Sequence, residues 1–242
     1  MATLRTLLFF AGWISATLVF GILGLPCLLR QRWCWWAANF WVNLTLGWLR
    51  LSCGIRSEHQ GIPATPLIAS KHQSAWDTLM LWRVLGNPVF VLKRELYAIP
   101  IFGWYLWRSG QIAINRAKGR EAYAQIETQA KPYLAQGRVM VVFPEGTRVP
   151  VGTHKPFHSG IARISAMLQL AVTPAAVNAG LFWPKHSLVK HAGTARLAFL
   201  PPLPVSPDDR QAWMQQLETS IETKTAELCV AETARNLQSR ET

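Results

Sequence analysis

Apolar residues dominate the first fifty positions of the chain. Residues 6–29 form a stretch of 24 positions without a charged side chain, which as a helix is long enough to cross a hydrocarbon core of about 30 Å. A second uncharged stretch of 17 residues, 33–49, contains five Trp, whose amphipathic rings prefer the level of the lipid headgroups. This pattern predicts an N-terminal apolar helical membrane anchor over residues 1–57. Two arrangements fit the pattern: one crossing followed by an interfacial helix, or a helix pair within one leaflet.

From residue 58 onward, short apolar runs alternate with helical periodicity. The runs predict buried strands at 67–70, 89–92, 111–114, 139–143, 172–177 and 196–200. Helical patterns lie between them at 76–85, 120–136 and 161–170, and a polar helix capped by Pro207, Asp208 and Asp209 reaches Cys229. Strands that alternate with helices are typical of a mainly parallel sheet. We therefore expect residues 58–242 to form an α/β domain, with a mainly parallel mixed sheet flanked by helices.

The charge of the chain suits an anionic partner. The sequence has 25 Lys and Arg residues against 13 Asp and Glu, a net charge of +12, and its 50% hydrophobic content excludes a disordered or fibrous chain. The basic residues stand singly between apolar runs and not in a dense stripe, which favours lipid or phosphate over nucleic acid. The four Cys form no CxxC pair, so we expect them to be buried free thiols.

A histidine and an aspartate follow the first predicted strand of the domain. His72 lies in the loop after 67–70, and Asp77 lies near the start of the next predicted helix. After a tight turn, this carboxylate can accept the imidazole Nδ1 hydrogen and leave Nε2 as a base. The alternative is a loop hydrogen bond and a helix cap without catalytic meaning. Ser74 is a weak candidate for a nucleophile because the chain has no G-x-S-x-G elbow, so the base is expected to act on a substrate hydroxyl.

Cations gather at the ends of other predicted strands. Residues 143–148, FPEGTR, provide a tight turn, a carboxylate, backbone donors and the guanidinium of Arg148. Lys93 and Arg116 follow two further strands. The carboxyl ends of parallel strands meet at one edge of a sheet, and Arg is suited to bidentate contact with phosphate. The pattern therefore predicts an anion site beside His72.

Four sequence blocks occur in the order found in one enzyme family. They are HQSAWD at 72–77, GQIAINR at 110–116, FPEGTR at 143–148 and AVTPAAV at 171–177. In this order they resemble the blocks of the glycerolipid acyltransferases. The resemblance implies transfer of a fatty acyl chain from a thioester, acyl-CoA or acyl carrier protein, to the free 2-hydroxyl of lysophosphatidate. The product would be phosphatidate, an intermediate of phospholipid biosynthesis, and no metal or separate cofactor is implied.

The resemblance also implies a role for each matching residue. His72 would be the general base and Asp77 the group that orients it. Acceptor binding would fall to Glu145 and Gly146 at the glycerol, to Arg116 and Arg148 at the phosphate, and to Lys93 as a third cation. With the anchor and the free thiols, we expect a cell inner membrane location with the catalytic domain facing the cytoplasm. The expected partners are membrane lipids, lysophosphatidate and the acyl donor.

One block departs from the family pattern. Where the family commonly has an aromatic and often an acidic residue before the arginine, this chain has Ala113 and Asn115. The departure leaves open a different lyso-lipid acceptor, such as a lysophospholipid or an acylated amino-acid lipid. An alternative of another class is a non-catalytic lipid-binding membrane protein, in which His72 and Asp77 would be dispensable.

Overall fold

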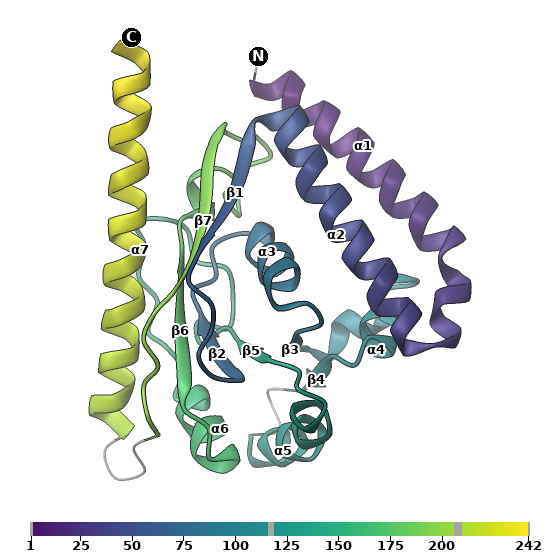
Figure 1. Cartoon of the computed structure of the whole chain (residues 1–242), viewed down its shortest axis with the longest axis vertical. Helices are drawn as coiled ribbons and strands as arrows, with labels where there is room; N and C mark the ends of the chain where they lie inside the picture. The colour runs from purple at the N-terminus through teal and green to yellow at the C-terminus, as the bar shows by residue number, and fades with distance from the viewer. Residues whose placement is uncertain (1, 116–118, 206–209, 242) are drawn as a thin grey trace.

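A seven-stranded sheet forms the centre of the molecule (Figure 1). The structure, a computed structural model, describes residues 2–115, 119–205 and 210–241. The strand order is β1-β7-β6-β2-β5-β3-β4, and neighbouring strands are parallel except for the antiparallel pair β6 and β7. The predicted α/β class and mainly parallel mixed sheet are confirmed. The strands are β1 (Ile55–Gln60), β2 (Leu67–Ser70), β3 (Val89–Lys93), β4 (Ile112–Ile114), β5 (Met140–Val142), β6 (Val172–Val177) and β7 (Gly193–Phe199).

Helices cover both faces of this sheet. Side chains of α1, α2 and α3 pack against Ile68 and Val141 on one face, whereas α5, α6 and α7 pack against Leu67 and Val142 on the other. Successive residues of a strand point to opposite faces, which is why neighbours in β2 and β5 belong to different cores. The helices are α1 (Ala2–Leu23), α2 (Gln31–Cys53), α3 (Ala75–Leu85), α4 (Phe102–Arg108), α5 (Arg120–Ala135), α6 (Gly160–Leu168) and α7 (Arg210–Glu241), with short 3-10 helices η1 (Leu25–Leu29), η2 (Arg94–Ala98) and η4 (Ala179–Leu181).

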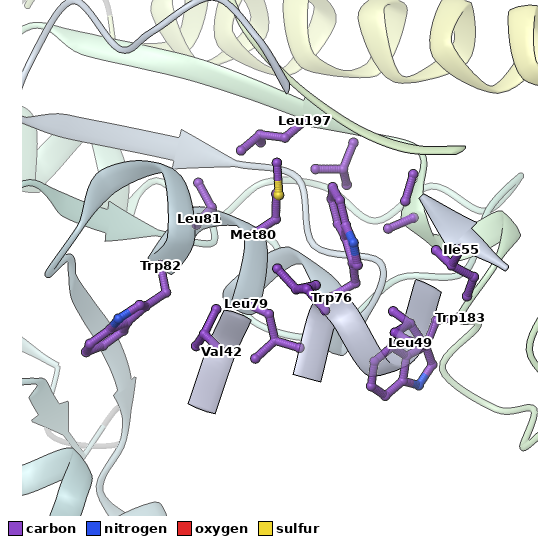
Figure 2. Close-up of a cluster of buried hydrophobic side chains, with 14 of the residues drawn as sticks. Val42, Leu49, Ile55, Trp76, Leu79, Met80, Leu81, Trp82, Trp183 and Leu197 are labelled. Carbon is purple, nitrogen blue, oxygen red and sulfur yellow. The ribbon is translucent and has the colours of Figure 1, made fainter. Parts of the chain in front are cut away.

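The first core joins α2 and α3 to the sheet (Figure 2). Trp76 of α3 is buried, and its Nε1 donates a hydrogen bond to Ser57 Oγ in β1 at 2.8 Å. Val42 and Leu49 of α2 are buried in the same cluster. Each such side chain stabilises the fold by about 1.5–3 kcal/mol when fully buried, so α2 is part of the domain core.

Strand β1 was not predicted from the sequence. Its residues are mostly polar, and only Ile55 is fully buried, because β1 lies at the edge of the sheet and pairs with β7. Such a strand lacks the apolar run by which buried strands are recognised. The predicted boundary between residues 57 and 58 falls inside β1. By contrast, the structure gives β2 and β6 the predicted bounds.

Helices α1 and α2 form an antiparallel hairpin beside α3 (Figure 1). Trp48 Nε1 donates to the Phe9 carbonyl at 3.1 Å, and Trp41 Nε1 donates to Thr17 Oγ1 at 3.1 Å. A Cβ on Gly12 would lie 2.5 Å from Trp48 Nε1, so the absence of a side chain at Gly12 leaves room for the Trp48 indole against α1. In the described part of the chain, α1 is the one helix long and apolar enough to cross a membrane.

Helix α4 was also missed by the sequence analysis. It is short and apolar all round, so it shows neither of the periodicities that indicate a helix or a strand. Arg108 at its end donates to the carbonyls of Leu28 at 2.7 Å and Leu29 at 2.9 Å, which fixes α4 beside the turn of the hairpin. Its Trp104 and Trp107 rings are exposed, as are many side chains of α1.

Candidate active site

His72 lies between the end of β2 and the start of α3, on the loop predicted for it. Its Nδ1 is 3.0 Å from Asp77 Oδ2. The imidazole is partly exposed and stacks on the Phe143 ring, with centroids 4.0 Å apart and an interplanar angle of 22°. Within the parts of the chain that the structure describes, Nε2 makes no hydrogen bond. The ring is therefore held on one edge and one face, while the nitrogen that could act as a base remains available.

Asp77 is fully buried and organises the whole loop. Its Oδ2 also accepts hydrogen bonds from the backbone N–H groups of Gln73 and Ser74, each at 2.7 Å. Ser74 Oγ is buried and accepts the Trp76 N–H at 3.2 Å, which completes a capping box at the start of α3. The two interpretations of this pair thus coincide, because one carboxylate caps the helix and faces the imidazole. The position of Ser74 gives no support to a nucleophilic role.

Glu145 lies in the interior behind His72. Its side chain has no exposed surface, and Oε2 accepts the His72 backbone N–H at 2.8 Å. Oε1 forms an ion pair with Lys71 Nζ at 2.7 Å, and the same Nζ donates to Glu222 Oε1 of α7 at 2.5 Å. The carboxylate expected from the resemblance to hold the acceptor glycerol therefore faces the protein interior.

The pKa values of both Glu145 and Lys71 are shifted by burial and by their mutual contact. Burial raises the pKa of the Glu145 carboxyl above its ordinary value, although Lys71 and the His72 N–H oppose the shift. Burial lowers the pKa of the Lys71 ammonium, but the two neighbouring carboxylates outweigh it, so that the net shift is upward. Lys71 is therefore a cation under the sheet edge.

The turn after β5 brings the 143–148 segment to the same sheet edge as His72. Gly146 has a φ of 69°, and its N–H donates to the Phe143 carbonyl at 3.0 Å. Lys155 Nζ donates to the Glu145 carbonyl at 2.9 Å. The turn continues into Val149, whose N–H donates to the His72 carbonyl at 2.8 Å. Residues 143–149 thus bind both backbone groups of His72, its N–H through Glu145 and its carbonyl through Val149.

Two of the three predicted cations, Arg148 and Lys93, lie in the described part of the chain at the carboxyl ends of strands. Arg148 is half-buried beside this turn, and Lys93 is exposed at the end of β3. Lys93 is in register with Ile114 at the end of β4. Arg116, which follows β4, lies outside the described residues, as do the predicted capping residues 207–209. Among the described residues, no three His, Cys, Asp or Glu side chains are grouped as a metal site would require.

Two supporting residues escaped the sequence analysis. Lys71 directly precedes His72, so the sequence already places it beside the candidate base. Its burial, however, could not be predicted from the sequence pattern. Glu222 is 151 residues from Lys71 in the chain and carries no local motif. Only the folded arrangement brings this α7 carboxylate to the loop that carries His72.

The sequence matches known acyltransferases. Residues 57–178 match the family model described as Acyltransferase. The chain is 36% identical over 208 residues to the 1-acyl-sn-glycerol-3-phosphate acyltransferase of Pseudomonas aeruginosa, an alignment that covers 82% of this chain and 80% of the relative. It is 31% identical over 225 residues to human 1-acyl-sn-glycerol-3-phosphate acyltransferase alpha, covering 88% and 77% of the two chains. The chain therefore belongs to the acyltransferase family, and the family predicted from the sequence is confirmed.

A solved structure shares the fold over nearly the whole chain. The crystal structure of the 1-acyl-sn-glycerophosphate (LPA) acyltransferase PlsC from Thermotoga maritima superimposes with a TM-score of 0.77. The match covers 94% of this chain and 98% of that chain, at 20% sequence identity. Because 94% of this chain is covered, most of the N-terminal hairpin lies within the match.

Proposed function

We propose that the chain transfers an acyl group from an acyl thioester to the 2-hydroxyl of 1-acyl-sn-glycerol-3-phosphate, giving phosphatidate. The observation that carries the proposal is the His72 imidazole, bound to Asp77 through Nδ1 with Nε2 unengaged among the described residues. The acceptor is the one named for the relatives from Pseudomonas aeruginosa and human. We extend the proposal to phospholipid biosynthesis, with acyl-CoA or acyl carrier protein as the donor.

In the proposed reaction, His72 first acts as a general base. Nε2 takes the proton from the 2-hydroxyl while the oxygen attacks the thioester carbonyl, and Asp77 stabilises the imidazolium that forms. The tetrahedral intermediate then collapses, the carbon–sulfur bond breaks, and the thiolate leaving group receives the proton from Nε2. The protein supplies one base and an anion site, and both substrates are held together on the enzyme.

An acceptor panel tests this function. Purified protein is incubated with a labelled acyl thioester and, in separate reactions, with 1-acyl-sn-glycerol-3-phosphate, a lysophospholipid and an acylated amino-acid lipid. Transfer to 1-acyl-sn-glycerol-3-phosphate with the highest kcat/KM is the expected result. A higher kcat/KM for another acceptor would replace the acceptor in the proposal, and no transfer to any of them would favour the non-catalytic lipid-binding protein.

Arg148 is expected to bind the acceptor phosphate. Lysine offers a point charge where the guanidinium offers two parallel donors, so Arg148→Lys should raise the acceptor KM by about tenfold or more. The KM for the acyl donor should change far less. Steady-state kinetics with each substrate varied in turn provide the measurement, and Arg83→Lys, an exposed arginine of α3, is the control. An equal effect on both substrates would contradict the assignment.

We further propose that the α1–α2 hairpin lies within one leaflet of the cell inner membrane, with the catalytic domain on the cytoplasmic side. Both ends of α1 contact the rest of the domain, which supports this arrangement over a crossing. Thr6 Oγ1 accepts the Lys190 N–H at 2.9 Å near one end, and the Gly21 carbonyl accepts from Tyr105 Oη at 3.3 Å near the other. Trp104 and Trp107 of α4 are also exposed, and Trp is a residue type that prefers the membrane interface.

The side on which the N-terminus lies distinguishes the two arrangements. In inside-out membrane vesicles, an N-terminal tag and the catalytic domain should both be digested by added protease, because a one-leaflet hairpin leaves them on the same side. The intact chain should also stay with the membranes through salt and carbonate washes, since buried apolar surface and not charge holds it. A tag protected from protease while the domain is cut would instead indicate a crossing.

A further inference from the structure

The loop that carries His72 is connected to the C-terminal helix α7 through a chain of ion pairs. Lys71 has 2% of its side chain exposed and contacts two carboxylates, Glu145 at 2.7 Å and Glu222 at 2.5 Å. Glu145 has no exposed surface, whereas Glu222 has 27% of its side chain exposed at the surface of α7. The contacts thus run from Glu222, which is 151 residues from Lys71 in the chain, to the backbone of His72.

Each link in this chain constrains the next. The Glu145 carboxylate accepts the His72 N–H, so its position fixes the backbone from which the imidazole projects. The Lys71 ammonium is its counter-ion, and a buried carboxylate without a counter-ion is strongly disfavoured. Lys71 has its own backbone N–H bonded to the Ala175 carbonyl at 2.9 Å, so only its long side chain can move. Glu222 supplies the second acceptor that fixes the end of that side chain.

We propose that Glu222 is a positioning residue for the transfer reaction, acting on His72 through Lys71 and Glu145. The inference rests on the proposed role of His72 as the base. Glu222 does not touch the substrates in this proposal, and its charge matters because it holds the Lys71 ammonium against Glu145. Helix α7 is then part of the support of the active site as well as a cover for the second core.

The first test replaces the carboxylate by its neutral isostere. Glu222→Gln should lower kcat by about tenfold while both KM values stay within about twofold, because the base is displaced but the substrate contacts are not. Glu227→Gln is the matched control, since this α7 carboxylate pairs with Lys224 at 2.9 Å on the exposed surface. The thermal midpoints of both variants should lie close to that of the wild type. Equal kcat values for the two variants would overturn the proposal.

A double-mutant cycle separates positioning from a general effect of α7 on the fold. If Glu222 acts through Lys71, adding Glu222→Gln to Lys71→Met should lower kcat no further, whereas independent effects would multiply. Should Lys71→Met not fold, the cycle uses Lys71→Met combined with Glu145→Gln, because this pair removes both buried charges together and leaves Glu222 no ammonium to hold. Multiplied losses would contradict the proposed route. Wild-type transfer in the same assay keeps a failure of this inference distinct from a failure of the proposed function.

Discussion

Replacing His72 with alanine is expected to reduce acyl transfer to background. The variant loses the Nε2 that would accept the hydroxyl proton, and acid–base catalysis of this kind contributes about 10²–10⁴-fold. The backbone contacts of residue 72 to Glu145 and Val149 do not involve the imidazole, so the loop should keep its course. The measurement is the initial rate with labelled acyl thioester and 1-acyl-sn-glycerol-3-phosphate, together with circular dichroism of the purified variant.

A matched histidine provides the control for this result. His154 is largely exposed, with Nε2 2.5 Å from Glu218 Oε1 on the surface of α7. His154→Ala should therefore keep its activity within about twofold of the wild type. If folded His72→Ala protein turned over at a near-normal rate, His72 would not be the base and the proposed mechanism would fail.

The second large effect is expected at Asp77. Asp77→Asn keeps the shape of the side chain but removes the charge that stabilises an imidazolium, and an amide nitrogen can face Nδ1 in place of oxygen. A loss in kcat of about 10²–10⁴-fold is expected from the disoriented ring. Binding of both substrates should persist, so the effect should appear in kcat and not in the KM values.

Ser74→Ala separates catalysis from helix capping in this experiment. It removes the Oγ that accepts the Trp76 N–H but leaves the contact between His72 and Asp77 in place. Loss of a cap costs about 1 kcal/mol of stability, so the free energy of unfolding should fall while kcat changes only a few-fold. A rate loss in Ser74→Ala as large as that in Asp77→Asn would mean that the loop conformation, and not the charge, governs the reaction.

The sequence predicted the elements with strong hydrophobic patterns. Strands β2 and β6 are buried along their whole length, and α3 follows a clear cap, so their bounds agree within a residue. Edge strand β1 and the short helix α4 were missed because the first is polar and the second is apolar all round. Contacts with distant parts of the chain determine that both elements form, so a local pattern does not reveal them.

The residues of the candidate site also differ in how far local sequence determines their contacts. His72 and Asp77 are five positions apart, so a local turn suffices to predict their contact. Glu145 was expected at the acceptor, but its surroundings depend on Lys71 and on a helix far along the chain. A motif identifies which residues matter, whereas the direction in which a buried carboxylate points is set by the fold around it.

The fastening of α1 to the loop before β7 has a consequence for biosynthesis. Thr6 and Lys190, which share a hydrogen bond, are 184 residues apart in the chain. Strand β1 pairs with β7, with Ile55 opposite Gly193, and so cannot pair until β7 has been synthesised. During translation, α1 therefore emerges long before the loop and strand that complete its surroundings, and contacts of such large sequence separation form late. In that interval the apolar surface of α1 lacks these partners, so we expect the nascent chain to need an early contact with lipid or with a chaperone.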